Sequence, residues 1–242
     1  MTTHAALDGH GLDDWRRQTR VVLQPIAAPS ILGLYAFSAA TMMVAANLAG
    51  WYGDARSPQF LFPFAAIFGG LAQLLAGMWS FRARDALATA MHGMWGSFWL
   101  AYGLLWLLVA TGVTTLPTGK FPELAFWFTM LAAITWIGAI AAAGENLGLF
   151  LTLLTLAGGA SCLAIRYFAD LGAWETAGGW VLVFSAGFAW YTASAMLLEG
   201  VYGRVILPLG MERRQAHIAP GRHAPVEPIE FALGEPGVRQ GQ

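Results

Sequence analysis

One histidine and two tryptophans stand out in MHGMWGSFWL, residues 91–100, a stretch that is otherwise mostly apolar or small. If this stretch is helical, His92, Trp95, Gly96 and Trp99 fall at positions i, i+3, i+4 and i+7 and share one face. An imidazole can exchange a proton near neutral pH, and an indole N–H donates a hydrogen bond without accepting one. Such a face could accompany a small polar solute through apolar surroundings. The alternative is a neutral histidine that bonds a backbone carbonyl between helices and is only structural.

The composition places this stretch in a membrane protein. Hydrophobic residues make up 57% of the 242-residue chain and charged residues only 11%, whereas soluble domains carry about 25% charged residues. The 11 Trp and 29 Gly fit a chain in lipid, because aromatic residues collect at bilayer interfaces and glycine is frequent in membrane helices. The net charge of −1 gives no electrostatic case for nucleic acid, and a single cysteine, Cys162, excludes an intrachain disulfide.

Six segments are apolar and long enough to cross a bilayer, which takes about 20 helical residues. We predict an all-α polytopic membrane fold with spans near residues 30–50, 59–81, 86–112, 122–143, 147–168 and 177–199. Short turn-rich or charged segments separate them, so consecutive helices pack antiparallel in one transmembrane domain, residues 28–210. Residues 1–27 are then a cytoplasmic N-terminal segment. Residues 211–242 form a disordered cytoplasmic tail, because they are rich in Pro and charge.

The distribution of Lys and Arg predicts the orientation. With an even number of spans both termini share one side, and that side carries all but three of the 13 Lys and Arg residues. The other side holds Arg56, Lys120 and Arg166. The positive-inside rule therefore places both termini in the cytoplasm, in a multi-pass protein of the cytoplasmic (inner) membrane.

The spans lack the groups on which most enzymes and pumps depend. The sequence has no Gly-rich phosphate loop, no Cys or His cluster with metal spacing and no paired carboxylates within a span. Carboxylates in mid-membrane are typical of ion-driven pumps, whereas here His92 is the only ionisable side chain clearly inside a span. We therefore predict no enzyme, no cofactor and no metal site. The remaining function is the transport of a solute that does not require charged side chains along its path, such as a weak acid, a small anion or urea.

Four motifs, in order along the chain, resemble the acetate uptake transporter family, the bacterial acetate/succinate–proton symporters and their yeast relatives. They are APSILGLYAFSAATMMVAANLAG (28–50), IFGGLAQLLAGMWSF (67–81), WGSFWL (95–100) and EGVYGRVILPLG (199–210). The matching residues include Pro29, Gly33, Leu34, Gly69, Gly70, Gly77, Gly96, Gly203, Arg204 and Pro208. The departures are Ala28 for Asn, Ile31 for Pro, Ser80 for an acidic residue, His92 for Phe and Trp95 for Tyr, so this is a divergent member.

The resemblance implies a homohexamer in which each protomer has its own solute path. It also implies that the path narrows at an apolar girdle, which falls in this chain on Phe37, Trp95 and Leu156. An apolar constriction blocks water and ions and passes a small neutral or partly desolvated solute. Without the resemblance, Phe37 and Trp95 are equally well explained as packing or lipid-facing aromatic residues.

Further residues are candidates for lining the path or binding the solute: His92, Gln73, Thr41, Ser97 and Trp99. An amide in hydrocarbon must find partners, so Gln73 either bonds another helix or lines the path. Thr41 and Ser97 have the alternative of bonding the carbonyls of their own helix. The small residues spaced by four around Gln73 favour close helix packing. Arg204 either anchors the end of the last span or makes an electropositive mouth.

The sequence thus predicts membrane transport of small carboxylates, with acetate first and succinate or other short-chain acids as further candidates. Transport is either proton-coupled or channel-like. The partners are the carboxylate, protons, the lipid bilayer and further copies of the chain. One alternative is a hexameric urea or short-chain amide channel, which also uses an aromatic constriction. Another is a membrane assembly or sensory component that transports nothing and binds a partner through its tail.

Overall fold

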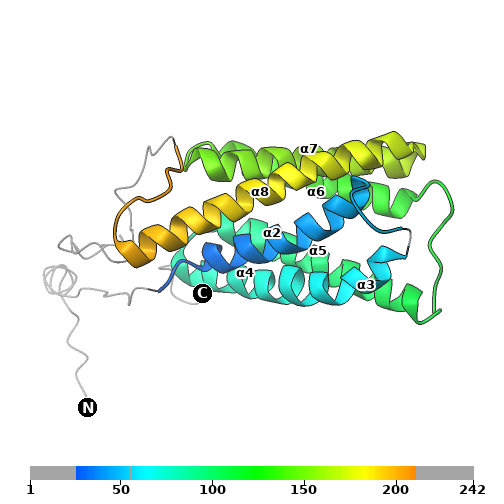
Figure 1. The fold of residues 1–242 in the computed structure, drawn as a ribbon, viewed down its shortest axis with the longest axis horizontal. Helices are drawn as coiled ribbons and strands as arrows, with labels where there is room; N and C mark the ends of the chain where they lie inside the picture. The colour runs from blue at the N-terminus through cyan, green and yellow to red at the C-terminus, as the bar shows by residue number, and fades with distance from the viewer. Residues whose placement is uncertain (1–25, 55, 211–242) are drawn as a thin grey trace, which may run out of the picture. The chain divides into compact units, whose positions relative to one another are not determined.

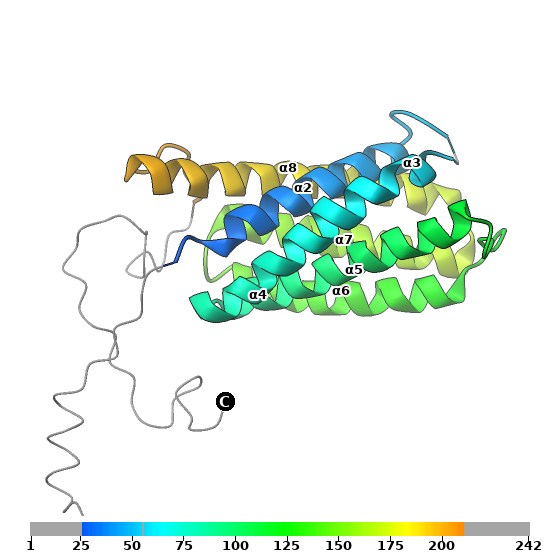
Figure 2. The same cartoon turned by 90° about the horizontal axis from the view of Figure 1, so that it is seen from below.

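Six helices in the described part of the chain are long and apolar enough to cross a membrane, which confirms the predicted all-α fold (Figure 1). The computed structural model describes residues 26–54 and 56–210. The spans are α2 (Pro29–Leu48), Ser57–Ala83, α5 (Ala86–Ala110), α6 (Pro122–Ala142), α7 (Leu147–Ala169) and α8 (Gly172–Tyr202). Consecutive spans run antiparallel (Figure 2). Most of the predicted N-terminal segment, and the predicted tail, lie outside the described residues.

One predicted boundary is wrong. The last span begins at Gly172, whereas the sequence predicted a start near residue 177. Glu175 lies in the first turn of α8, where a negative charge is favourable. Its Oε2 accepts a hydrogen bond from Arg166 Nε at 2.7 Å, and Arg166 Nη1 donates to Asp170 Oδ1 at 2.6 Å. These ion pairs allow charged residues to begin a helix in this otherwise apolar sequence.

The second span is built from three helical pieces, which the sequence did not predict. It consists of α3 (Ser57–Phe64), the π-helix η1 (Ala65–Ala72) and α4 (Gln73–Ala83). Pro63 lies inside α3 and has no N–H to offer to the helical ladder, just before the π-helical turns begin. Stretches of π-helix are rare and often mark functional positions. Here Gln73, the first residue of α4 after this stretch, is buried inside the bundle.

Helices α4 and α5 approach each other until their backbones touch. A Cβ added at Gly77 would lie 2.6 Å from the backbone nitrogen of Gly93, and one added at Gly96 would lie 2.6 Å from that of Leu74. Only glycine fits at these two positions. The small-residue motifs of these helices therefore serve close packing, as the sequence suggested for the row that includes Gly77.

Helices α2, α5 and α7 begin at one end of the bundle, and α4, α6 and α8 end there; we call it the termini end. The Asp85 side chain caps α5 by accepting a hydrogen bond from Ala88 N at 2.8 Å, and Asn146 caps α7 in the same way. Gly203 ends α8 in a left-handed conformation, with φ of 65°. The segment that follows returns to the bundle, where Pro208 O accepts a hydrogen bond from the Tyr191 hydroxyl at 2.8 Å.

Candidate solute path

A cavity of about 80 Å³ lies between α2, α4, α5, α7 and α8. Its lining runs from the helix starts and connections at the termini end, where Ser30, Asp85 and Glu145 lie, to the middle of the bundle. The residues in the middle include Phe37, Trp95 and Leu156. The structure therefore places all three predicted girdle residues around one cavity.

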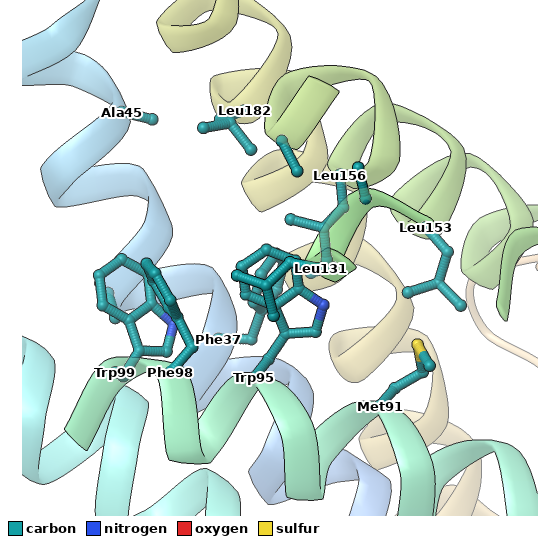
Figure 3. Close-up of a cluster of buried hydrophobic side chains, with 14 of the residues drawn as sticks. Phe37, Ala45, Met91, Trp95, Phe98, Trp99, Leu131, Leu153, Leu156 and Leu182 are labelled. Carbon is teal, nitrogen blue, oxygen red and sulfur yellow. The ribbon is translucent and has the colours of Figure 1, made fainter. Parts of the chain in front are cut away.

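The girdle residues come from three helices and gather in the core of the bundle (Figure 3). The Phe37 and Trp95 rings meet edge to face, with centroids 6.4 Å apart and an interplanar angle of 66°. Their side chains and that of Leu156 are buried. Edge-to-face contact is a favoured arrangement of aromatic pairs. Three apolar side chains therefore meet at the inner end of the cavity, which is the arrangement that the predicted girdle requires.

A hydrogen bond holds the Trp95 indole in place. Its Nε1–H donates to Thr135 Oγ1 on α6 at 3.1 Å, and the Thr135 hydroxyl donates to Leu131 O at 2.6 Å. Thr135 is completely buried. Thr135 was not among the predicted path residues, although a threonine in an apolar span is a usable signal. The bond fixes the orientation of the widest side chain in the girdle.

Four buried polar atoms beside the girdle have no hydrogen-bond partner in the described part of the chain. They are Thr41 Oγ1, Gln73 Oε1, His92 Nδ1 and Trp99 Nε1. All four belong to residues that the sequence put forward as lining the path or binding the solute. Buried polar atoms are nearly always hydrogen-bonded in native proteins. The open atoms therefore give this region a capacity to bind a polar solute.

These open atoms lie on both sides of the girdle. His92 lies one helical turn before Trp95 on α5, and Trp99 lies one turn after it. Thr41 follows Phe37 by one turn on α2, and so lies on the same side as Trp99. Gln73 and His92 both line the cavity, and His92 lies on the side of the termini end. A solute that crosses the girdle would leave one set of polar atoms and meet another.

His92 packs flat against the backbone of α2. A Cβ at Gly33 would lie 2.5–2.6 Å from three atoms of the imidazole ring, so this motif glycine makes room for the ring. The side chain is 5% exposed. Its Nδ1 does not make the backbone hydrogen bond that the structural alternative requires.

Ser97 and Arg204 lie outside this arrangement. Ser97 is exposed on α5, and its hydroxyl donates to Gly93 O at 2.7 Å. It follows Trp95 by two residues, which turns it to the opposite side of the helix, so the structure does not bring it to this cavity and shows the alternative in which it bonds its own helix. Arg204 is exposed beyond α8 and does not line the cavity. Thr41, by contrast, does not bond its own helix and keeps its hydroxyl open.

Two acidic residues at the mouth of the cavity were missed. Asp85 and Glu145 were not among the predicted path residues, yet both line the cavity at the termini end. Partial burial raises the pKa of the Glu145 carboxyl, and the nearby Asp85 carboxylate raises the same pKa further. Loop residues from distant parts of the sequence meet here because α2, α5 and α7 begin at this face and α4, α6 and α8 end at it. Sequence spacing could not show that meeting.

Six apolar spans around an internal cavity, with two aromatic rings and a leucine at its inner end, define a polytopic membrane protein. A model of the GPR1/FUN34/yaaH family matches residues 16–208, and the chain belongs to this family. This confirms the predicted resemblance.

The relatives and a solved structure agree with this membership. The chain is 26% identical over 189 residues to the succinate-acetate/proton symporter SatP of Escherichia coli (strain K12), covering 76% of this chain and 96% of that protein. It is 25% identical over 202 residues to acetate permease A of Emericella nidulans, covering 78% of this chain and 67% of the permease. The structure of the bacterial acetate channel SatP matches with a TM-score of 0.70 at 24% identity, over 77% of this chain and 100% of that one. The last match shows a shared fold.

Proposed function

We propose that this protein transports acetate and similar short-chain carboxylates across the cytoplasmic membrane. The observation that carries the proposal is the meeting of Phe37, Trp95 and Leu156 at the end of one cavity. Two relatives support acetate as the solute, because one is named a succinate-acetate/proton symporter and the other an acetate permease.

The girdle favours a solute with a small apolar part and a charge that can be neutralised. Moving an ionised carboxylate into apolar surroundings is costly, whereas the neutral acid crosses at much lower cost. The open polar atoms on either side would hold the carboxyl group before and after the crossing. This arrangement supports proton-coupled passage of the acid over free flow of the anion.

The proposal includes an orientation and an assembly. The termini end faces the cytoplasm, because the side with the termini carries most of the Lys and Arg residues. The chain forms a homohexamer with one path in each protomer. Large apolar side chains such as Phe64, Trp79 and Phe126 cover the outside of the bundle, where lipid or further copies can contact them. Native mass spectrometry in mild detergent should show hexamers, and a sample of monomers and dimers alone would contradict the assembly.

Counterflow in proteoliposomes tests the function. Vesicles that contain the full chain should exchange labelled acetate faster than protein-free vesicles, which measure leakage of the acid through lipid. Flux of labelled urea without acetate flux would instead identify an amide channel. Flux of neither solute would indicate a membrane protein with an assembly or sensory role. Ser97→Ala is a suitable control, because this exposed residue lies away from the cavity and should leave the flux unchanged.

A further inference from the structure

The mouth of the cavity carries negative charge. Asp85 and Glu145 line it, and none of the described lining residues is Lys or Arg. Glu145 is exposed, so it contacts water as well as the cavity. Two neighbouring carboxylates oppose the entry of a third carboxylate in its anionic form. A mouth of this charge is poorly suited to collecting acetate as an anion.

The interior of the same cavity holds a buried hydrogen-bond acceptor that no donor among the described residues satisfies. Gln73 is only 2% exposed, and its buried Oε1 has no hydrogen-bond partner among the described residues. This amide oxygen can only accept a hydrogen bond. A carboxylate anion offers acceptors alone, whereas a protonated carboxylic acid offers one O–H. Gln73 Oε1 can therefore accept a hydrogen bond from the protonated acid and not from the anion.

We propose that Glu145, with Asp85 beside it, exchanges a proton with the solute at the termini-end mouth. The neutral acid that has crossed the girdle transfers its proton to the Glu145 carboxylate, so one O–H bond breaks on the acid and one forms on Glu145. The anion leaves to the aqueous side, and Glu145 then gives the proton to water. Transport in the other direction reverses these steps. The inference rests on the proposed function and assigns its proton step to residues of this chain.

The surroundings of Glu145 suit such an exchange. Asp85 and His92 are the other acid–base groups of the described cavity lining, both contributed by the start of α5. Arg82 and Arg84 end α4 nearby in the sequence, and Glu199 and Arg204 lie at the end of α8. The raised pKa of the Glu145 carboxyl brings it closer to neutral pH, where a group exchanges protons most effectively.

The experiment measures acetate and protons together in vesicles that contain the full chain. Labelled acetate reports the solute, and a pH-sensitive dye inside the vesicles reports the proton. The wild-type protein should import about one proton per acetate, and the flux should not respond to membrane potential. Glu145→Gln should lower acetate flux about tenfold and flatten its dependence on the pH at the termini end. Asp85→Asn should have a smaller effect, because asparagine still caps α5.

Three controls separate the outcomes. Glu123→Gln removes an exposed carboxylate in the first turn of α6, at the other end of the bundle, and should change nothing. Glu145→Asp keeps the acid and should retain most of the flux, which keeps the test valid if Gln at this position impairs folding. The infrared band of protonated carboxyls should include, in the wild-type protein, a component that titrates above the ordinary pKa of glutamate, and this component should be absent in Glu145→Gln.

Some results would overturn the assignment. Wild-type acetate flux with an unaltered rate, pH dependence and proton count in Glu145→Gln would do so, and would leave the proposed function intact. Acetate flux that follows membrane potential without proton entry would do the same. Transport of labelled methylammonium in place of acetate would show that the acidic mouth collects cations, and would overturn both proposals.

Discussion

The buried polar side chains differ between the two halves of the bundle. On α6, α7 and α8 they have partners: Thr135, Thr152, Ser185 and Thr192 all donate to backbone carbonyls, and Ser194 bonds the Tyr35 hydroxyl. On α2, α4 and α5, four buried polar atoms have no partner within the described residues. We call α6, α7 and α8 the finished half, because their buried polar side chains are hydrogen-bonded. We call α2, α4 and α5 the open half, because four of their buried polar atoms have no partner among the described residues.

The difference suggests how stability and transport are divided. An unsatisfied buried polar atom lowers stability, and its replacement by an apolar group of similar shape is close to neutral or favourable. Removal of a satisfied group instead leaves its partner unpaired. Variants of the finished half should therefore affect folding first, and variants of the open half should affect flux first. Trp95 belongs to both halves, since it lies on α5 and bonds α6.

The largest effect should come from Trp95→Ala. Loss of a buried tryptophan costs about 3–5 kcal/mol of stability, and loss of its ring widens the girdle. We expect a lower midpoint of thermal unfolding and a rise of butyrate flux relative to acetate. Competition assays in proteoliposomes measure the ratio. An unchanged ratio in folded protein would mean that Trp95 does not restrict the path.

Gln73→Leu should separate flux from folding. Removal of the open amide oxygen should lower acetate flux about tenfold, the equivalent of one lost hydrogen bond of about 1.4 kcal/mol to the solute. The unfolding midpoint should stay the same or rise. Ser185→Ala is the matched variant of the finished half, where the hydroxyl donates to Thr152 O at 2.9 Å. It should lower the unfolding midpoint and leave the flux per folded protein unchanged; the reverse pattern would contradict the division.

Thr135→Val tests the bond that fixes Trp95. The change should cost about 1 kcal/mol, because it removes one satisfied hydroxyl and frees the indole N–H. The freed ring should admit larger acids to a smaller degree than Trp95→Ala does. If butyrate and acetate keep their wild-type ratio, packing alone orients the indole. Thr155→Val, a partly buried threonine on α7 that bonds its own helix, controls for loss of a hydroxyl.

His92 allows a finer test. Gln at this position keeps hydrogen bonding without titration, and Phe removes both. We expect Gln to retain most of the acetate flux and Phe to lower it by about twofold, the value of a weak hydrogen bond of about 0.5 kcal/mol. Flux measured between about pH 5 and 8, where free imidazole titrates, shows whether the proton matters. Wild-type rates and pH dependence in both variants would make the histidine structural.

The smallest effect concerns stability and pH at Glu145. Its pKa is raised in the folded state, so ionisation of this carboxyl at pH 7 lowers stability. Glu145→Gln should therefore be slightly more stable than the wild-type protein at pH 7, by less than about 1 kcal/mol because the residue is exposed. The gain should disappear as the pH falls through the raised pKa and both states bind the proton. Thermal unfolding at several pH values measures it, and a gain that persists in acid would contradict the sign.

The sequence predicts the spans well because apolar length is a local property. Five of the six spans begin and end within a few residues of their predicted bounds. The π-helical piece of the second span was not predicted, because hydrophobic content does not reveal which turn carries an extra residue. The ion pairs of Arg166 moved the start of α8, and they depend on side chains that meet across a turn.

The candidate site was predictable where family motifs covered it. Phe37 and Trp95 lie in such motifs, and both line the cavity. The contact of Thr135 with Trp95 was not predictable from the sequence, because it depends on which turns of α5 and α6 lie at the same level of the bundle. Asp85 and Glu145 are 60 residues apart in the sequence, and only the meeting of helix ends makes them neighbours at one mouth. Ser97 also lies in a family motif and does not line the cavity, because a motif does not reveal which face of its helix points inward.

The contact between Gly33 and His92 restricts the order in which related sequences can diverge. While the imidazole occupies its place against α2, any side chain at position 33 collides with it. Replacement of His92 by a smaller residue must therefore precede the loss of Gly33, and the opposite order passes through an impaired protein. The two positions are energetically coupled, as contacting residues commonly are. In descendants of this sequence, histidine at position 92 should accordingly be found together with glycine at position 33.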